Sequence, residues 1–214
     1  MKISVSFLKA RYSFFKTLTF LEKSSADYLH VDVMDGLFVN NRTPFSKEML
    51  DALKRNKKPK EVHLMTLHLK KFIDIFSYIE PEVIVYEFEA TTKHEELISY
   101  IKTKNCRVGI AISPLTNLDY LLPYLTEIDM VLVMSVIPGY GGQKFIPDTL
   151  KRIEKLKKIR KEKKANFLLH VDGGVNESTI LDLKSVKPDR VVVGSYVCGA
   201  VDFDKQLEKL EEYL

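Results

Sequence analysis

The chain has 214 residues, of which 45% are hydrophobic, and a formal net charge of +4. This length fits one or two domains, and the apolar content excludes a disordered chain because it can build a sizeable core. The small net charge is compatible with binding an anionic metabolite and does not indicate a nucleic-acid partner.

Eight short apolar segments alternate along the chain with amphipathic or charged segments. We predict strands, in chain order, at residues 3–7, 28–33, 61–65, 83–88, 108–112, 130–136, 167–172 and 190–194. Charged segments such as 95–104 and 204–214 are predicted to be helices. Strands that alternate with helices in this way indicate a parallel sheet.

The same pattern indicates how the sheet closes. Near-continuous apolar strands such as 130–136 fit burial on both faces. No Pro/Gly-rich linker, low-complexity segment or composition break divides the chain. Eight units in one undivided domain, residues 1–214, favour a near-minimal α/β fold, a single-domain (β/α)8 TIM barrel, over an open doubly wound sheet.

The densest basic run, residues 151–164, is predicted to be a helix. Leu150, Ile153, Leu156 and Ile159 recur there at helical spacing among the lysines. This pattern indicates a solvated helix face over an apolar stripe rather than a nucleic-acid patch.

Polar side chains gather at the predicted carboxyl ends of the strands, where the active sites of such barrels lie. His30 and Asp32 are two residues apart, so they face the same side of their strand. His63 lies near the end of the third strand and Asp172 closes the seventh. One such residue alone would more often be a core histidine or a turn former. Together they predict a site for a divalent transition metal such as zinc.

Glycines follow the last three strands. The loops in question are 138–143 (PGYGGQ), Gly173 with Gly174, and Gly194 with Ser195. Glycines let backbone N–H groups approach an anion closely, and the loops after strands seven and eight are the usual phosphate site of this fold. We therefore predict phosphate binding here, and the loop at 138–143 could also be a lid.

Three methionines stand near the ends of strands two, three and six. Spacing alone assigns Met34, Met65 and Met134 to core packing, but around a site they would form an apolar collar that excludes water. Asp35 precedes Gly36 beyond the second strand, and we expect it to form a turn.

The two strand-end aspartates suggest a reaction. Asp32 and Asp172 come from strands three apart in a ring of eight, so they could flank a bound ligand. A metal ion between them could stabilise an ene-diolate. This arrangement suits proton abstraction beside a carbonyl by one carboxylate and proton return on the opposite face by the other.

Taken together, these motifs resemble the ribulose-phosphate 3-epimerase family over nearly the whole chain. The matching segments are 26–36 (which contains HVDVMDG), 62–65 (VHLM), 108–112, 133–136, 138–145 (PGYGGQKF), 171–175 (VDGGV) and 193–195 (VGS). Any one of these segments would be weak, but their order and spacing together are highly specific.

The resemblance implies a (β/α)8 barrel that interconverts D-ribulose 5-phosphate and D-xylulose 5-phosphate in the pentose phosphate pathway. It implies one divalent metal ion, zinc or alternatively Fe²⁺, Mn²⁺ or Co²⁺, held by His30, Asp32, His63 and Asp172. Asp32 and Asp172 match the acid/base pair. The implied substrate contacts are Ser6, Met34, His63, Met65, Met134, Gly139, Tyr140, Gly141, Gly142, Asp172, Gly173, Gly174, Gly194 and Ser195.

Four positions depart from the family pattern without touching the metal or acid/base residues. Val5 and Asn40 stand where the family usually has Pro, Ile137 where Asn or Glu is frequent, and Glu87 where His is frequent. A carboxylate at Glu87 would repel an anionic substrate if it pointed inward. If Glu89 faces in, strand alternation turns Glu87 outward and the change matters little.

Three other functions stay open at this point. The nearest is an epimerase for a related ketose phosphate such as D-allulose 6-phosphate, although Gly174 and Ser195 favour the pentose. The hexulose-phosphate synthase and orotidine-phosphate decarboxylase group needs Asp-x-Lys on an early strand, and Met34 stands in the lysine position. A non-catalytic sugar-phosphate-binding barrel is the most distant alternative, because all ligand and acid/base positions are present.

The remaining features concern location and partners. Cys106 and Cys198 are far apart and in no paired motif, so we expect buried structural thiols in a reducing compartment. The N-terminus lacks the apolar region of a signal peptide, and no stretch is long enough to span a bilayer. We expect a cytoplasmic protein that binds a small phosphorylated ketose, with no nucleic-acid or membrane partner. Whether it forms a homo-oligomer stays open.

Overall fold

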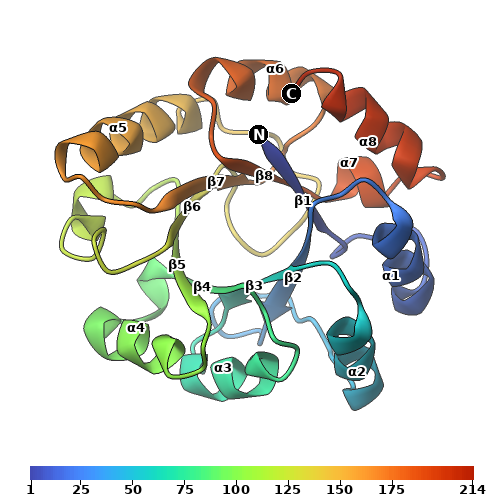
Figure 1. Cartoon of the computed structure of the whole chain (residues 1–214), viewed down its shortest axis with the longest axis horizontal. Coiled ribbons are helices and arrows are strands. Elements are labelled where there is room, and N and C mark those ends of the chain that lie inside the picture. Colours follow the sequence, from blue (N-terminus) through green and yellow to red (C-terminus); the bar gives the residue numbers. More distant parts are fainter.

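A computed structural model describes residues 1–214 and shows eight parallel strands in a closed barrel (Figure 1). The strands are β1 (Lys2–Ser6), β2 (Tyr28–Met34), β3 (Lys60–Met65), β4 (Val83–Glu87), β5 (Arg107–Ile112), β6 (Met130–Met134), β7 (Leu168–Asp172) and β8 (Arg190–Val193). Each strand pairs with its neighbours in chain order, and β1 pairs with β8 to close the ring. The predicted (β/α)8 barrel and its eight strands are confirmed.

Helices surround the strands on the outside of the barrel (Figure 1). They are α1 (Phe14–Lys23), α2 (Lys47–Arg55), α3 (Leu69–Ser77), α4 (His94–Lys102), α5 (Thr149–Glu162), α6 (Glu177–Val186), α7 (Ser195–Cys198) and α8 (Phe203–Glu211), with 3-10 helices η1 (Phe88–Ala90) and η2 (Leu118–Leu121). None of these helices combines the length and apolar character needed to cross a bilayer.

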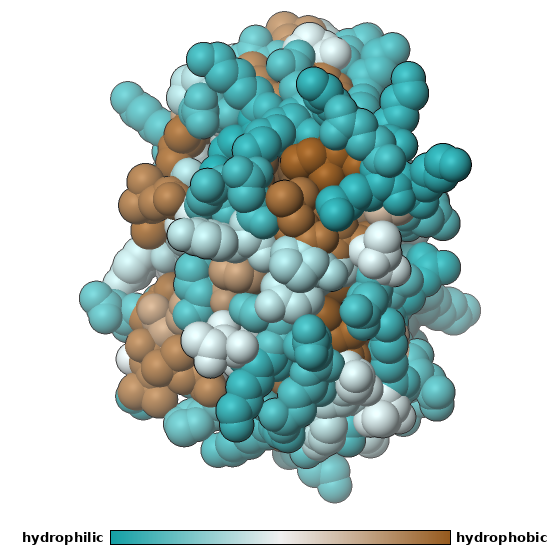
Figure 2. All heavy atoms as spheres, turned by 90° about the vertical axis from the view of Figure 1, so that its left-hand side faces the viewer, coloured by the Kyte–Doolittle hydropathy of each residue, from teal (hydrophilic) through white to brown (hydrophobic).

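The connection between β5 and β6 is the exception to the alternation, because it contains η2 and no α-helix. Pro114 and Pro123 flank η2. Proline lacks a backbone N–H and clashes with the preceding turn, so a regular helix cannot run through this segment. Figure 2 shows this side of the molecule, on which hydrophilic side chains surround several separate hydrophobic patches.

Helix α5 confirms the interpretation of the basic run. Ile153 and Leu156 are fully buried, and Leu150 and Ile159 pack partly against the core. The apolar stripe holds the helix against the barrel, and its lysines lie on the opposite, hydrated face.

Two apolar clusters divide the core. The larger one, of 46 buried residues, lies between the barrel wall and the helices. The smaller one lies inside the barrel and consists of Val83, Val85, Ala111, Met130, Leu132, Met134 and Val192. These residues alternate with the wall residues of β4, β5, β6 and β8, as the two-residue period of a strand requires. Most of the buried polar residues of the interior lie on β1, β2, β3 and β7, with Glu87 on β4 and Arg190 on β8.

The two cysteines lie apart from any polar cluster. Cys106 and Cys198 are buried and free, as expected. Burial raises the pKa of the Cys198 thiol to about 12 and also raises the pKa of Cys106.

Because the thiolate is the reactive form, we predict that neither cysteine of the native protein reacts within minutes with a chromogenic disulfide reagent at pH 8. Both should react after unfolding in guanidinium chloride, which serves as the control. Absorbance of the released chromophore measures the reaction. Rapid modification of one thiol per native chain would contradict the burial of Cys106 or Cys198.

Candidate active site

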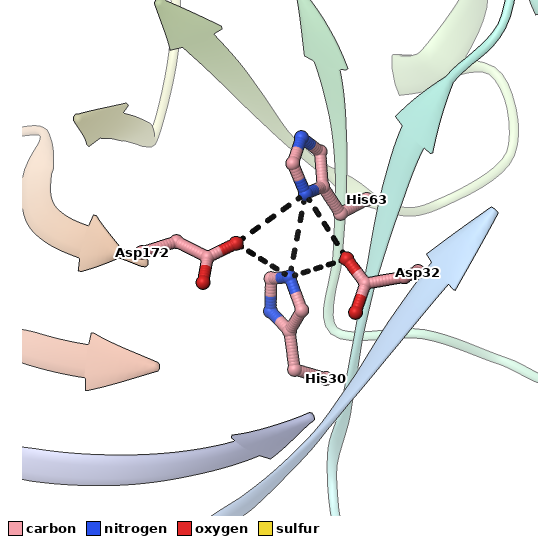
Figure 3. Close-up of side chains that lie close together, drawn as sticks. All are labelled: His30, Asp32, His63 and Asp172. Carbon is pink, nitrogen blue, oxygen red and sulfur yellow. Dashed lines mark hydrogen bonds and ion pairs between the residues drawn. The ribbon is translucent and has the colours of Figure 1, made fainter. Parts of the chain in front are cut away.

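Two histidines and two aspartates converge inside the barrel near the carboxyl ends of three strands (Figure 3). His30 and Asp32 come from β2, His63 from β3 and Asp172 from the end of β7. Asp32 and His63 are register partners across β2 and β3. One donor atom of each residue lies within 4.8 Å of the donor atoms of the other three. The structure therefore brings together the four residues that the sequence singled out.

The donor atoms of this cluster face a common centre. His30 Nε2 lies 3.5 Å from Asp32 Oδ1 and 3.6 Å from Asp172 Oδ2. His63 Nδ1 lies 3.4 Å and 3.7 Å from the same two oxygens, and the two ring nitrogens are 3.4 Å apart. Zinc–ligand distances of about 2.0–2.2 Å imply ligand separations of roughly 3.3–3.6 Å in a tetrahedron. The four residues thus could hold one divalent metal ion.

A carboxylate stands behind each histidine. His30 Nδ1 lies 3.3 Å from Glu61 Oε2, and His63 Nε2 lies 2.9 Å from Glu87 Oε1. A hydrogen bond at one ring nitrogen fixes the tautomer and leaves the other nitrogen as a ligand. The two carboxylates therefore direct His30 Nε2 and His63 Nδ1 toward the cluster.

Glu87 corrects the expectation that strand alternation would turn it outward. Its side chain is fully buried inside the barrel. Glu89 lies in η1, after β4 has ended, and its Oε1 accepts a hydrogen bond from the Ser113 N–H, so alternation does not relate the two glutamates. Glu87 Oε2 has no hydrogen-bond partner, an arrangement that destabilises the fold. Contact with His63 is the role that the structure gives this carboxylate, and it lies behind the histidine rather than in the pocket.

The two aspartates differ in their electrostatics. Burial would raise the pKa of Asp32, but His30 and His63 outweigh it and hold that pKa well below its ordinary value. Ser6 Oγ also donates a hydrogen bond to Asp32 Oδ2 over 2.6 Å. Burial raises the pKa of Asp172 to about 6. Two carboxylates whose pKa values are pushed apart by their surroundings are suited to acid/base chemistry.

The imidazoles respond to the same charges. Burial acts to lower the pKa of His63, yet hydrogen bonds to Asp32 and Glu87 raise it to about 9. The pKa of His30 is raised in the same way, against its burial, mainly by Asp32. The surrounding carboxylates therefore favour positive charge between them, and a divalent cation would supply that charge to the cluster.

Beneath His30, a buried ion-pair network holds Glu61 in place. Arg190 Nη1 donates to Glu61 Oε1, and His170 Nδ1 lies 3.3 Å from the same oxygen. The Arg190 guanidinium stacks on the Tyr28 ring, 3.2 Å from its centroid. Burial opposes ionisation of Glu61, but His170, His30 and Arg190 lower its pKa to about 2. Glu61 is therefore a fixed negative charge that orients His30.

A pocket opens above the cluster and contains nearly all the predicted substrate contacts. The predicted residues that line it are Ser6, Asp32, Met34, Met65, Met134, Gly139, Tyr140, Gly141, Gly142, Asp172, Gly173, Gly174, Gly194 and Ser195. His30 and His63 are fully buried below its floor. The three methionines are buried as well, so their side chains form an apolar wall next to the polar cluster.

Close approach of two loops explains the glycine pair after β7. Gly173 has φ +116°, and a Cβ there would lie 2.4 Å from the Val136 side chain. Gly174 has φ +66°, and its Cβ would lie 2.5 Å from the backbone nitrogen of Phe145. Only glycine fits such positions, so the loops after β6 and β7 can lie against each other.

Backbone N–H groups at the rim of the pocket have no partner in the protein. Those of Gly142, Gly174, Gly194 and Ser195 donate no hydrogen bond to any protein atom. Backbone N–H groups gathered around a concave surface form an anion site. The glycine loops are therefore suited to a phosphate group, as their sequence predicts.

The loops after β2 and β6 meet over the pocket. Asn41 Nδ2 donates to the Gly139 carbonyl oxygen over 3.0 Å. Asn40 and Ile137, two of the departures from the family pattern, are exposed on these loops. Val5, another departure, is buried in the outer core. None of these three residues belongs to the cluster of His30, Asp32, His63 and Asp172.

Sequence reasoning missed three residues at this site. Glu61 is two residues before His63, so strand alternation could have identified it as an inward-facing partner. For Glu87 the sequence left the orientation conditional on that of Glu89, and its contact with His63 was not foreseen. Lys9 follows β1 and lines the pocket, but nothing in the sequence distinguishes it among 33 lysines and arginines.

Comparison with known proteins gives this geometry a context. A family model described as the ribulose-phosphate 3 epimerase family matches residues 2–198. A ribulose-phosphate 3-epimerase from Buchnera aphidicola is 38% identical over 196 residues, covering 90% of this chain and 86% of the relative. One from Helicobacter pylori is 34% identical over 212 residues, covering 99% of this chain and 97% of the relative.

Similar solved structures share only the fold. A 3-hexulose-6-phosphate synthase from Salmonella typhimurium superposes with a TM-score of 0.73 at 19% identity, covering 100% of this chain and 98% of that chain. A Streptococcus mutans structure named KGPDC gives a TM-score of 0.72 at 12% identity, covering 99% and 96% of the two chains. At such low identity, barrels of this kind host many unrelated reactions.

The contact between Glu87 and His63 leads to a testable prediction. We expect Glu87→Ala to weaken Zn²⁺ binding by about 10- to 100-fold, because His63 loses the partner that fixes its tautomer. Competition with a chromogenic chelator measures the dissociation constant. Glu89→Ala, which removes a nearby carboxylate outside the barrel interior, is the matched control and should bind Zn²⁺ like the wild type. Equal affinities for wild type and Glu87→Ala would show that this carboxylate does not support the cluster.

Proposed function

This chain belongs to the ribulose-phosphate 3-epimerase family and is an isomerase, and on that basis we propose that it interconverts D-ribulose 5-phosphate and D-xylulose 5-phosphate at C3. The observation that carries this proposal is the placement of Asp32 and Asp172 on opposite sides of one buried cluster at the floor of the pocket (Figure 3). Two carboxylates so placed can act on the two faces of one carbon atom.

We assign the metal ligands to His30, Asp32, His63 and Asp172, and the ion to zinc. Two imidazole nitrogens and two carboxylate oxygens form a borderline donor set of the kind that zinc accepts, with Fe²⁺, Mn²⁺ and Co²⁺ as alternatives. When bound, such an ion supplies positive charge beside the oxygens of an ene-diolate.

The proton transfers belong to the two aspartates. One carboxylate removes the proton from C3, and the other returns a proton to the opposite face, which inverts that carbon. Ser6 orients Asp32 through its hydrogen bond to Oδ2. Ser135 holds the end of β7 by donating from Oγ to the carbonyl oxygens of Asp172 and Gly173, over 2.7 and 2.6 Å. The Asp32 carboxylate and the backbone that carries Asp172 are thus held by neighbours that do not take part in the chemistry.

The remaining pocket residues bind and shield the substrate. Met34, Met65 and Met134 surround the reacting carbons and exclude water, which protects an ene-diolate from side reactions. The phosphate group is held by the unpaired N–H groups of the glycine loops after β6, β7 and β8.

The proposal extends to the whole chain and its cellular role. Residues from Ser6 to Ser195 line one pocket, which supports a single catalytic domain over residues 1–214. The pentose phosphate pathway is the corresponding metabolic route. The free, buried thiols suit the cytoplasm, which keeps cysteines reduced.

The reaction can be tested by isotope incorporation. Metal-loaded protein incubated with D-ribulose 5-phosphate in D2O should give xylulose 5-phosphate with deuterium at C3, because the returned proton comes from a carboxylate that exchanges with solvent. NMR of the C3 position follows the reaction. Exchange only with D-allulose 6-phosphate would move the assignment to the hexose phosphate. Exchange with neither substrate would rule out the epimerase assignment.

The role of Asp172 can be tested separately. We predict that Asp172→Asn lowers kcat by about 10³-fold, since an amide cannot carry the proton, while circular dichroism stays native. Asp182→Asn, the same change on the exposed face of α6, is the control and should leave kcat unchanged. Metal content of each variant should be measured alongside. Near-normal turnover of Asp172→Asn would remove Asp172 from the acid/base pair.

A further inference from the structure

Lys9 is the only lysine or arginine among the residues that line the active-site pocket. The other charged side chains there are Asp32 and Asp172, which are both acidic. A bound divalent metal ion would offset those two negative charges and leave Lys9 as the only cationic side chain of the lining that could face a phosphate dianion. If the pocket binds a sugar phosphate, Lys9 is therefore the side chain that can supply positive charge to the phosphate group.

The backbone around Lys9 is held by two hydrogen bonds. The Ala10 N–H donates to the Phe7 carbonyl oxygen over 3.2 Å, which closes a turn directly after β1. The Arg11 N–H donates to the Cys198 carbonyl oxygen over 2.7 Å, which ties this turn to α7. Since α7 begins at Ser195, the turn is fixed next to one of the loops assigned to phosphate.

The Lys9 side chain lies along the glycine loop after β6. Its Cγ and Cδ are both 3.4 Å from the point where a Cβ of Gly141 would stand, which is ordinary van der Waals contact. Its Nζ is 3.7 Å from the corresponding point on Gly142, and Ser195 Oγ is 3.9 Å from that same point. The ammonium group therefore lies where the loops after β6 and β8 meet.

The Lys9 ammonium also makes no competing interaction. It forms none of the salt bridges or hydrogen bonds that occupy lysines elsewhere, such as Lys155 with Asp119 or Lys70 with Glu96. Beside it, the N–H groups of Gly142 and Ser195 have no protein partner. A point positive charge next to unpaired N–H groups is the combination by which proteins bind phosphate.

We propose that the ammonium group of Lys9 binds the phosphate group of the substrate, between Gly142 and Ser195, and makes the pocket selective for phosphorylated sugars. The assignment rests on the proposed function, because it takes a ketose phosphate as the ligand. Lys9 acts on binding and not on proton transfer, so its contribution is the same in the ground state and in the transition state.

Steady-state kinetics provide the first test. Lys9→Met keeps the packing stem and removes the charge, so KM for D-ribulose 5-phosphate should rise about tenfold while kcat changes by less than about twofold. Lys9→Arg should recover most of the loss. Lys47→Met, which removes an exposed lysine of α2 that does not line the pocket, should behave like the wild type. An unchanged KM for Lys9→Met, or a fall confined to kcat, would overturn the proposal.

Inorganic phosphate provides a second test that needs no turnover. Isothermal titration of the metal-loaded protein should show about tenfold weaker phosphate binding by Lys9→Met than by the wild type or Lys47→Met. Equal affinities, or no measurable binding by the wild type, would contradict the assignment of Lys9. If phosphate binding depends on Lys9 but no ketose phosphate is epimerised, the proposed function fails while the phosphate assignment stands.

Discussion

Charge enclosed in the barrel is the constraint on which this structure depends. Inside a ring of eight strands, Asp32, Glu61 and Glu87 are buried and Asp172 is partly buried beside them, and an ionised carboxylate in such surroundings must be compensated. His30 and His63 lie between these carboxylates and compensate their charge. Each ring contacts a glutamate behind it and the two aspartates in front. The same contacts that neutralise the interior therefore arrange four donor atoms around one centre.

The barrel tolerates this charge because its interior is divided into two sides. On one side, a small apolar cluster from β4, β5, β6 and β8 fills the space at close packing. On the other side, β2 and β3 carry the polar residues, with Arg190 and Tyr28 closing the network from below. The apolar side keeps the interior dry, which strengthens every electrostatic contact on the polar side. Strand alternation then keeps both sets separate from the outer core.

Much of the fold and of the cluster could be predicted from the sequence, for physical reasons that also set the limit. Strands buried on both faces are rich in apolar residues, so all eight were identifiable, and residues near their carboxyl ends, such as His30 and Asp172, could be assigned to one mouth. The orientation of Glu87 could not be inferred from Glu89, because β4 ends at Glu87 and the two-residue period does not continue into η1. Lys9 escaped prediction because its position depends on a loop brought over it from β6, and no local pattern records such an approach.

Because the first strand pairs with the last, the barrel can close only after β8 has been synthesised. Residues 2–6 are made first and can pair with β2 early, but their other edge can pair with β8 only when residues 190–193 have been translated. Arg190 belongs to that last strand, so Glu61 lacks its guanidinium partner throughout most of synthesis. The network behind His30 is therefore complete only once the final strand is in place. A chain that ends before β8 would carry all four residues of the cluster but could not close the barrel around them.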